Sequence, residues 1–472
     1  MVFSSNVFLL YFLPLFLLCY FACPKKFRNY VILLFSIVFY GWGAPDFILY
    51  LLASTIANFY LVRLMQKTEK TGLKKLYCGL AITISLGLLV YYKYANFLID
   101  NLNALMGVFG ANAILMAKVA LPIGISFFTF QSITYVIDVY RGHNEPMRKL
   151  SDYIVYIMMF PQLIAGPIVR YCDIEKDILH RETSSMACLH GLRRFVIGLS
   201  KKVLVADVIG LQVDKLLAGD LALMDTGTAW ITIAAYTMQL YFDFAGYSDM
   251  AIGLGKVMGF HFPENFDNPY NSSSITEFWR RWHITLGAFM RNYLYIPLGG
   301  NRCSKRRMYF NLWVVFLLSG LWHGASWNFV VWGAWHGFWL VLERMGLKQV
   351  YEKIGKAPSI LITFIIAMVG WAVFRIEDLN DAFTFVGRLF AFDFSSFSIQ
   401  ADAQFYTMLV VALLFSFITL FPFGKKLQYA VYDKEYTTLG TVVAWFLSIV
   451  MLVFCIAAIN AVGFSPFIYF RF

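Results

Sequence analysis

Apolar residues form long runs along the whole chain, and short polar or basic loops separate one run from the next. A helix that crosses a bilayer needs about 20 mostly apolar residues, and fewer where it is re-entrant or enclosed by protein. On this criterion the pattern predicts membrane segments from one end of the sequence to the other. These segments are 4–22, 30–43, 46–64, 77–97, 113–139, 152–169, 226–247, 308–321, 325–342, 358–375, 404–422 and 438–461.

Charged residues gather in the loops in a way that predicts the direction of the chain. Basic patches follow alternate segments, whereas the stretch 376–403 is acidic and holds just one basic residue, Arg388. Cytoplasmic loops carry an excess of Lys and Arg, so the basic loops are predicted to be cytoplasmic, with the N-terminus and 376–403 outside. The basic patches lie at 25–28, 67–75, 141–149, 302–307, 348–356 and 425–426.

Two further stretches are too charged to cross a bilayer alone. Residues 170–205 mix Arg, Lys and acidic residues with apolar ones. The turn-rich polar stretch 261–276 ends in a capping box, Ser274 with Glu277, which predicts a helix near 276–295. We expect interfacial, re-entrant or cytoplasmic helices near 170–205 and 276–295.

The composition favours one all-α, polytopic membrane domain over residues 1–472. Hydrophobic residues make up 60% of the chain and charged residues 14%, with a mean hydropathy of +0.64. Soluble proteins are about 45–50% apolar and about 25% charged. The net charge of +11 is accounted for by the basic loops, so no nucleic acid is expected as a partner. The seven cysteines form no CxxC pair and are expected to be buried thiols, so no metal site is predicted.

The signatures of soluble enzymes are missing from the sequence. It has no HExxH motif, no P-loop, and no Gly-x-Ser followed by the second glycine of a nucleophile elbow. The histidines are therefore the main candidates for catalytic residues. His143, His180 and His190 lie in basic, loop-like stretches and are expected at the surface. His261 opens the polar stretch, and the sequence favours neither a surface role nor a functional one for it.

His323 is the first candidate for chemistry, because ionisable groups at membrane depth are costly and usually functional. The stretch 308–342 is too short for two full spans and a loop, so the turn at 320–326 is expected in an outward-facing recess. The glycines of this region would allow a close approach by other backbone or by a substrate. Residue chemistry alone leaves two alternatives for His323, a general base or a core imidazole bonded to a carbonyl.

His283 is the second candidate. On the predicted helix it shares a face with Trp279, Leu286 and Met290, which would turn it towards the protein interior, as a proton carrier or a substrate ligand. His336 is expected to serve helix packing. Three polar residues near membrane depth, Gln239, Asp243 and Asp249, would orient a histidine or bond to backbone.

Three long strings resemble the membrane-bound O-acyltransferase (MBOAT) family, and within it the bacterial alginate O-acetylation subfamily. They are YFDFAGYSDMAIGLGKVMGF at 241–260, NFDNPYNSSSITEFWRRWHITLGAFMRNYLYIPLGGNR at 265–302 and SGLWHGASWNFVVWGAWHG at 319–337. The strings at 121–142, 160–171 and 466–472 are similar to the same subfamily, so the resemblance runs nearly end to end.

The resemblance implies a bowl-shaped helical membrane fold with a thinned centre and an essential histidine. That histidine is the one in the LWHGA string, His323, and His283 matches the other characteristic position. It also implies a bacterial inner-membrane O-acetyltransferase that uses acetyl-CoA as donor. The acceptor would be an extracytoplasmic polysaccharide such as alginate, reached directly or through an SGNH-type partner. No tightly bound cofactor is expected, and no residues for coenzyme A binding can be assigned.

The sequence is also compatible with other functions. Related proteins move D-alanine towards teichoic acid, or acetyl groups to peptidoglycan or cellulose. A transporter or exporter without catalysis would also place polar residues in the membrane, but the sequence has no related halves to favour it.

Overall fold

A computed structural model describes the chain except residues 395–398, 400, 433, 435, 464–465 and 469–472. In the described part every regular element is a helix, and the single β feature is an isolated bridge between Phe266 and Trp282. The prediction of an all-α polytopic protein is confirmed. The chain divides into two compact units, residues 1–188 with 254–263, and residues 189–253 with 264–472. One domain over 1–472 stays a prediction.

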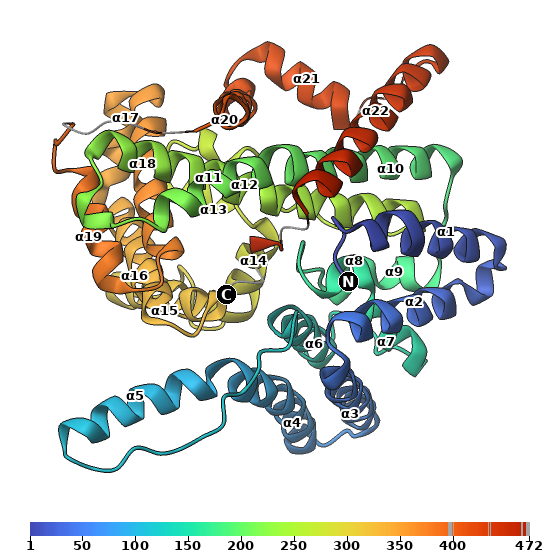
Figure 1. The fold of residues 1–472 in the computed structure, drawn as a ribbon. Coiled ribbons are helices and arrows are strands. Elements are labelled where there is room, and N and C mark those ends of the chain that lie inside the picture. The colour runs from blue at the N-terminus through green and yellow to red at the C-terminus, as the bar shows by residue number, and fades with distance from the viewer. Residues whose placement is uncertain (395–398, 400, 433, 435, 464–465, 469–472) are drawn as a thin grey trace. The chain divides into compact units, whose positions relative to one another are not determined.

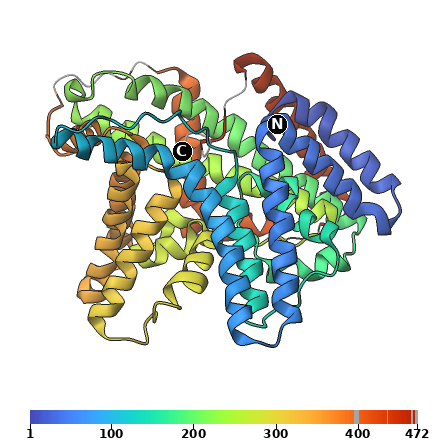
Figure 2. The ribbon, with the colours of Figure 1, turned by 90° about the horizontal axis from the view of Figure 1, so that it is seen from below.

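The first unit is built from nine α-helices, the first residues of α10 (Ser185–Ser200) and the end of α12 (Thr226–Met258). Helices α3, α4 and α6 pack side by side, and α2 packs against α7 (Figures 1 and 2). The bounds are α1 Leu13–Ala22, α2 Arg28–Gly43, α3 Ile48–Lys67, α4 Thr71–Leu89, α5 Ala95–Val108, α6 Ile125–Tyr140, α7 Leu150–Met158, α8 Phe160–Leu163 and α9 Tyr171–Leu179.

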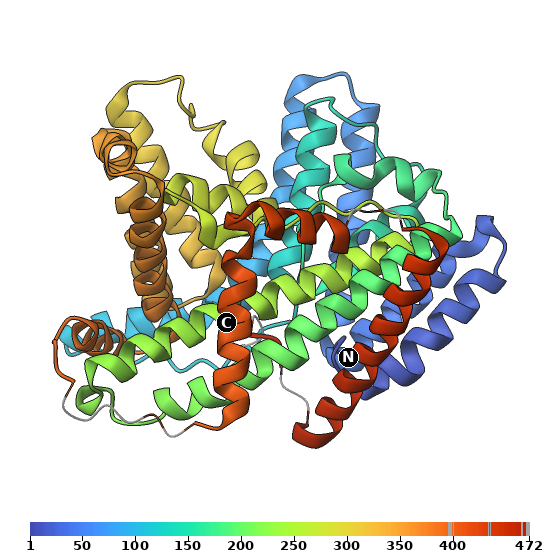
Figure 3. The same cartoon turned by 90° about the horizontal axis from the view of Figure 1, so that it is seen from above.

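The second unit holds the remaining α-helices. Helix α12 runs alongside α10 (Figure 3), because glycines let the backbones touch: a Cβ on Gly198 would lie 2.5 Å from the carbonyl oxygen of Gly246. The bounds are α10 Ser185–Ser200, α11 Asp207–Leu217, α12 Thr226–Met258, α13 Ile275–Arg281, α14 Ile284–Phe289, α15 Lys305–His323, α16 Trp327–Leu342, α17 Lys348–Ile354, α18 Lys356–Arg375, α19 Leu379–Leu389, α20 Ala403–Phe417, α21 Pro422–Tyr432 and α22 Thr438–Val462.

Several helices are long and apolar enough to cross a membrane, as the sequence pattern predicts. The helix Thr438–Ala461 has only 17% of its most apolar window buried inside the protein, so most of its surface is available to lipid. The spans among the described residues are Pro45–Lys67, Thr71–Val108, Lys356–Arg375, Ala403–Leu420 and Thr438–Ala461, and the shorter apolar helix Phe8–Ala22 precedes them.

Two predicted segments are wrong in detail. Within 113–139, the part before Pro122 is irregular, and its backbone pairs with α5: the side-chain amide of Asn96 both donates to and accepts from Val119, at 2.9 and 3.0 Å. The segment 152–169 breaks into α7 and α8, because Pro161 stands at the start of α8 and Gly166 has a φ of 100°. Proline and left-handed glycine end helices that hydrophobicity alone would continue.

Candidate active site around two histidines

His323 is the last residue of α15, and the turn into α16 covers only 324–326, which is shorter than the predicted turn at 320–326. Its side chain lies in an aromatic cage, with its ring centroid 5.0 Å from that of Trp332 and 5.4 Å from that of Phe374, both edge-on. The residue keeps 5% of its surface exposed. Rings on several sides thus hold the imidazole in one orientation, and its place in an outward-facing recess stays a prediction.

Glycines bring α15 and α16 together beside His323. A Cβ on Gly320 would lie 2.2 Å from the carbonyl oxygen of Phe329, and one on Gly333 would lie 2.3 Å from that of Phe316. Real Cβ atoms do not approach backbone that closely, so both positions need glycine. The expectation of a close backbone approach at Gly320 is therefore correct, and the approaching group is α16.

His283 does not lie within a helix, which corrects the predicted helix at 276–295. The chain breaks between α13 and α14, and His283 is the N-cap of α14 with a φ of 46°, in the left-handed region. It therefore does not share a helical face with Trp279, which precedes the break. The capping box forms only in part: the Ser274 hydroxyl accepts the Glu277 N–H, whereas the Glu277 carboxylate accepts from Ser273.

Asn265 holds His283, and sequence reasoning missed it. Its side-chain oxygen lies 3.0 Å from Nδ1 of His283 and accepts the Thr285 hydroxyl at 2.9 Å and the Thr285 backbone N–H at 3.4 Å. Its Nδ2 donates to the Ser248 hydroxyl of α12 at 3.0 Å. The backbone N–H of Ile284 also donates to the Asn265 carbonyl, at 2.9 Å. One residue thus fixes both the ring and the backbone of the break.

These bonds determine where the proton of His283 sits. Because two Thr285 donors point at the Asn265 oxygen, that atom is an acceptor, and His283 donates its Nδ1–H to it. The Nε2 atom then carries the lone pair of the neutral ring. Burial lowers the pKa of His283 to about 3, so the ring is neutral at physiological pH.

The two candidate histidines share a neighbour. The Trp322 ring lies 6.0 Å from the His283 ring and 5.0 Å from the His323 ring, measured between centroids. Phe244 of α12 packs edge-on against His283 at 4.7 Å. The two side chains that the sequence singled out, 40 positions apart, therefore belong to one aromatic cluster in the second unit.

The other candidates lie around this cluster. His336 is fully buried and contacts the rings of Trp279 and Trp332 at 4.9 and 5.1 Å, which agrees with the expected packing role. Asp243 pairs with Lys202 at 2.9 Å and accepts the Ile468 backbone N–H at 2.8 Å. Gln239 packs against Gly210 of α11.

The surface histidines follow the prediction more closely than the cysteines do. His143, His180 and His261 are exposed, whereas His190 is half-buried. All seven cysteines are free thiols, but only Cys78 and Cys455 are buried as predicted; Cys172 is exposed, and the other four are half-buried. The described residues contain no group of His, Cys, Asp and Glu arranged to hold a metal ion.

The hydrogen bonds of Asn265 give a testable consequence. We expect Asn265→Ala to destabilise the protein by about 1–3 kcal/mol, because the buried donors of Thr285 and His283 lose their acceptor and the Ser248 hydroxyl loses a donor. Thermal unfolding in detergent measures this loss. Asn380→Ala, at an exposed position of α19, is the control and should leave the transition within a degree or two of the native one. An unchanged transition in Asn265→Ala would contradict the assignment.

Comparison with known proteins gives consistent matches. Residues 9–375 match the model of the membrane-bound O-acyltransferase family. A probable alginate O-acetylase of Azotobacter vinelandii is 44% identical over 91% of this chain and 86% of its own length. A probable alginate O-acetylase of Pseudomonas putida is 41% identical over the full length of both chains. A peptidoglycan O-acetyltransferase of Helicobacter pylori is 34% identical, over 81% of this chain and 78% of its own length.

Proposed function

Because the chain belongs to the membrane-bound O-acyltransferase family, we propose that this multi-pass membrane enzyme moves an acetyl group from cytoplasmic acetyl-CoA to an extracytoplasmic polysaccharide. The observation that carries the proposal is the common packing of His283 and His323 on Trp322. Similarity to probable alginate O-acetylases over nearly the whole chain supports alginate as the acceptor.

His323 acts as the general base in this proposal. Its imidazole takes the proton of an acceptor hydroxyl while the hydroxyl oxygen forms a bond to the thioester carbonyl carbon. The tetrahedral intermediate then expels the coenzyme A thiolate as the C–S bond breaks, and the imidazolium returns its proton to that thiolate. The products are an acetyl ester and free coenzyme A, so atoms and charges balance.

His283 is assigned as a hydrogen-bond acceptor beside His323, because a ring with a pKa of about 3 takes up no proton at physiological pH. Because its Nδ1–H is donated to Asn265, the neutral ring offers a lone pair at Nε2 rather than a donor. An oxyanion needs donors, so the hydrogen bonds of His283 favour a backbone amide of the turn at 324–326 for that task. The neutral ring of His283 therefore does not steady the oxyanion in this scheme.

The charge pattern of the loops and the choice of acetyl-CoA as donor set the proposed location and orientation of the protein. We place the protein in a bacterial inner membrane, with the N-terminus outside and the basic loops in the cytoplasm, where acetyl-CoA is found. The acetyl group reaches the polymer directly or by way of an SGNH-type partner outside the membrane. Coenzyme A is a substrate in this scheme, and no resident cofactor or metal takes part.

Acetylation of alginate in cells tests this assignment. The protein is expressed in an alginate-producing host whose own O-acetylase gene is deleted, and acetyl esters on the secreted polymer are measured by NMR. We expect ester content well above that of the empty-vector strain. Expression in the membrane without any gain in esters would contradict alginate as the acceptor.

D-alanyl transfer to teichoic acid is the rival within the same enzyme class, followed by acetylation of peptidoglycan or cellulose. Purified protein offered acetyl-CoA or a D-alanyl carrier-protein thioester in parallel separates the two donors. We expect the thioester to be consumed only when acetyl-CoA is the donor. Loss with the D-alanyl carrier alone would replace the proposed cargo.

A further inference from the structure

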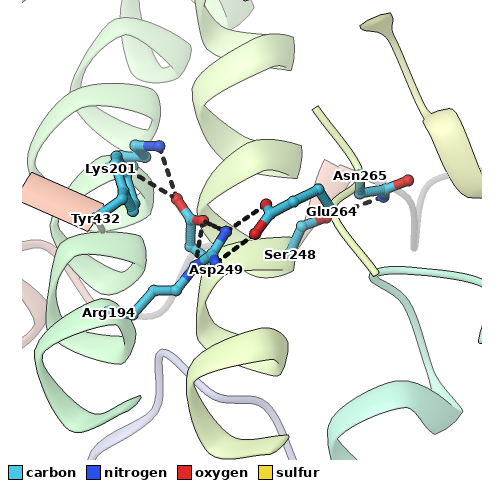
Figure 4. Close-up of polar contacts among 7 residues, drawn as sticks. All are labelled: Arg194, Lys201, Ser248, Asp249, Glu264, Asn265 and Tyr432. Atoms are coloured by element: carbon cyan, nitrogen blue, oxygen red, sulfur yellow. Dashed lines mark hydrogen bonds and ion pairs between the residues drawn. The ribbon is translucent and has the colours of Figure 1, made fainter. Parts of the chain in front are cut away.

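A cluster of charged side chains surrounds Asp249 of α12, five positions after Phe244, which packs on His283. The Asp249 carboxylate accepts from Arg194 Nε and Nη2 at 3.0 and 2.8 Å and from Lys201 Nζ at 2.7 Å (Figure 4). The Tyr432 hydroxyl of α21 donates to it at 3.3 Å. Asp249 is 6% exposed, so these donors balance a charge that would be costly if it stood alone.

Arg194 also extends this cluster to the loop after α12. Its guanidinium donates from Nη1 and Nη2 to the two carboxylate oxygens of Glu264, at 2.6 and 2.5 Å. The same Nη2 serves Asp249, so a single planar group joins α12 to the loop. Fork-shaped pairing of this kind fixes geometry as well as charge, which a lysine could not do.

Glu264 is the residue before Asn265. The two neighbours are tied to consecutive positions of α12: Asn265 to Ser248 by a hydrogen bond, and Glu264 to Asp249 through Arg194 (Figure 4). Beyond them the loop pairs with the break that carries His283, where the Asp267 N–H donates to the Arg281 carbonyl at 2.9 Å. One short stretch of backbone, residues 264–267, therefore connects the charged cluster with the break at His283.

His283 needs such support because its backbone is strained. A non-glycine residue at φ 46° costs about 1–3 kcal/mol and persists only where its surroundings hold it. The bonds from Asn265 hold the ring and the following N–H, but their geometry depends on where the loop places Asn265.

We propose that Arg194, Asp249 and Glu264 are positioning residues for His283, and that they act by clamping the Glu264–Asn265 dipeptide against α12. This inference rests on the proposed role of His283 in transfer. None of the three touches the reacting atoms. Their effect on the reaction is to keep Nε2 of His283 at one place while substrate is turned over.

The test variant is Glu264→Gln, which keeps the size of the side chain and removes the charge from the Arg194 pair. Glu264 has a side chain that is 57% exposed, so the substitution is compatible with folding. The matched control is Asp393→Asn, which removes the charge from a similar pair with Arg388 at 2.6 Å and a carboxylate that is 39% exposed. That pair lies beside Thr226 at the start of α12, whereas the dipeptide follows the end of α12.

Two readouts are measured on purified protein in detergent. The first is kcat and KM for acetyl-CoA: we expect kcat in Glu264→Gln to fall about 10- to 100-fold with KM within about twofold, since misplacing a reacting group by about 1 Å costs rate rather than binding. The second is modification of histidines by diethyl pyrocarbonate, followed by peptide mass spectrometry. We expect modification of His283 to rise several-fold in Glu264→Gln.

His336 is the internal reference for that second readout, because it is fully buried in the same unit and packs on Trp279 and Trp332. Its modification should stay at the native level in Glu264→Gln, and Asp393→Asn should match the native protein in both readouts. Arg194→Lys, which keeps the charge but cannot bridge both carboxylates, should reproduce the effect of Glu264→Gln.

Three results would overturn the proposal. Native kcat in Glu264→Gln, in a protein where His283→Ala is inactive, would show that the clamp does not position the histidine. Equal increases in modification at His283 and His336 would show general loosening instead. A loss of the same size in Asp393→Asn would show that any ion pair has this effect. Full activity in His283→Ala is a separate result, because it removes the role of His283 in the proposed function itself.

Discussion

Replacing His323 with alanine is expected to lower acetyl transfer to the polymer by about 10²- to 10⁴-fold at unchanged expression in the membrane. A positioned general base contributes a factor of this size, because the acceptor hydroxyl is a poor nucleophile while it keeps its proton. The rings of Trp332 and Phe374, which pack on His323, are themselves too weakly basic to take that proton. Acetyl esters on the secreted polymer, measured per unit of enzyme, give the magnitude.

The matched control for this variant is His261→Ala. His261 is exposed, and its ring pairs with Asp177 at 3.1 Å in the first unit, outside the histidine cluster. We expect native levels of ester in that variant. If His323→Ala acetylates the polymer at the native rate, His323 is not the base, and the proposed mechanism is wrong at its first step.

Gly320→Ala is expected to have the second largest effect, on stability and activity together. The added Cβ would meet the carbonyl oxygen of Phe329 at 2.2 Å, and a backbone atom cannot turn aside as a side chain can. Overpacking of this kind costs about 1–3 kcal/mol and forces α15 away from α16. His323 lies three residues further along α15, so we expect transfer to fall at least tenfold as its ring leaves the cage.

Gly337→Ala is the control for the packing argument. It lies on the same interface, but its nearest neighbour would be a Trp313 side-chain carbon at 3.4 Å, which is ordinary contact. Thermal unfolding in detergent and ester formation are measured for both variants. The account expects a lowered unfolding temperature in Gly320→Ala alone. Equal behaviour of the two variants would contradict the close approach of α15 and α16.

The apolar pattern predicts most helices, because a bilayer stabilises a helix with a long apolar run whichever helices pack against it. The apolar pattern fails where proline or glycine determines where a helix begins or ends. Pro122 and Gly124, with a φ of 80°, delay the helix predicted from residue 113 until Ile125, and Pro161 divides the next segment. Proline and glycine were visible in the sequence, and giving them more weight against the apolar runs would have placed both breaks.

The site was predicted in part. His323 and His283 stand out because ionisable residues are rare in Trp-rich apolar sequence, and the structure brings both onto Trp322. Asn265 was missed because periodicity describes helix faces, whereas this residue works from a loop through pairing with the break at His283. The signal that remained was the polar stretch 261–276 itself, whose Asn and Asp residues favour turns that bond to nearby backbone.

The most direct test of the central claim follows both the bond that breaks and the bond that forms. Purified protein and its His323→Ala variant receive acetyl-labelled coenzyme A thioester and a hydroxyl-bearing oligosaccharide, and free thiol and labelled ester are measured together. The account predicts equal amounts of thiol and ester from the native protein, and at least a hundredfold slower release of both from His323→Ala. Thioester that stays intact with the native protein, as a transporter without catalysis would leave it, or native rates in the variant would contradict the account.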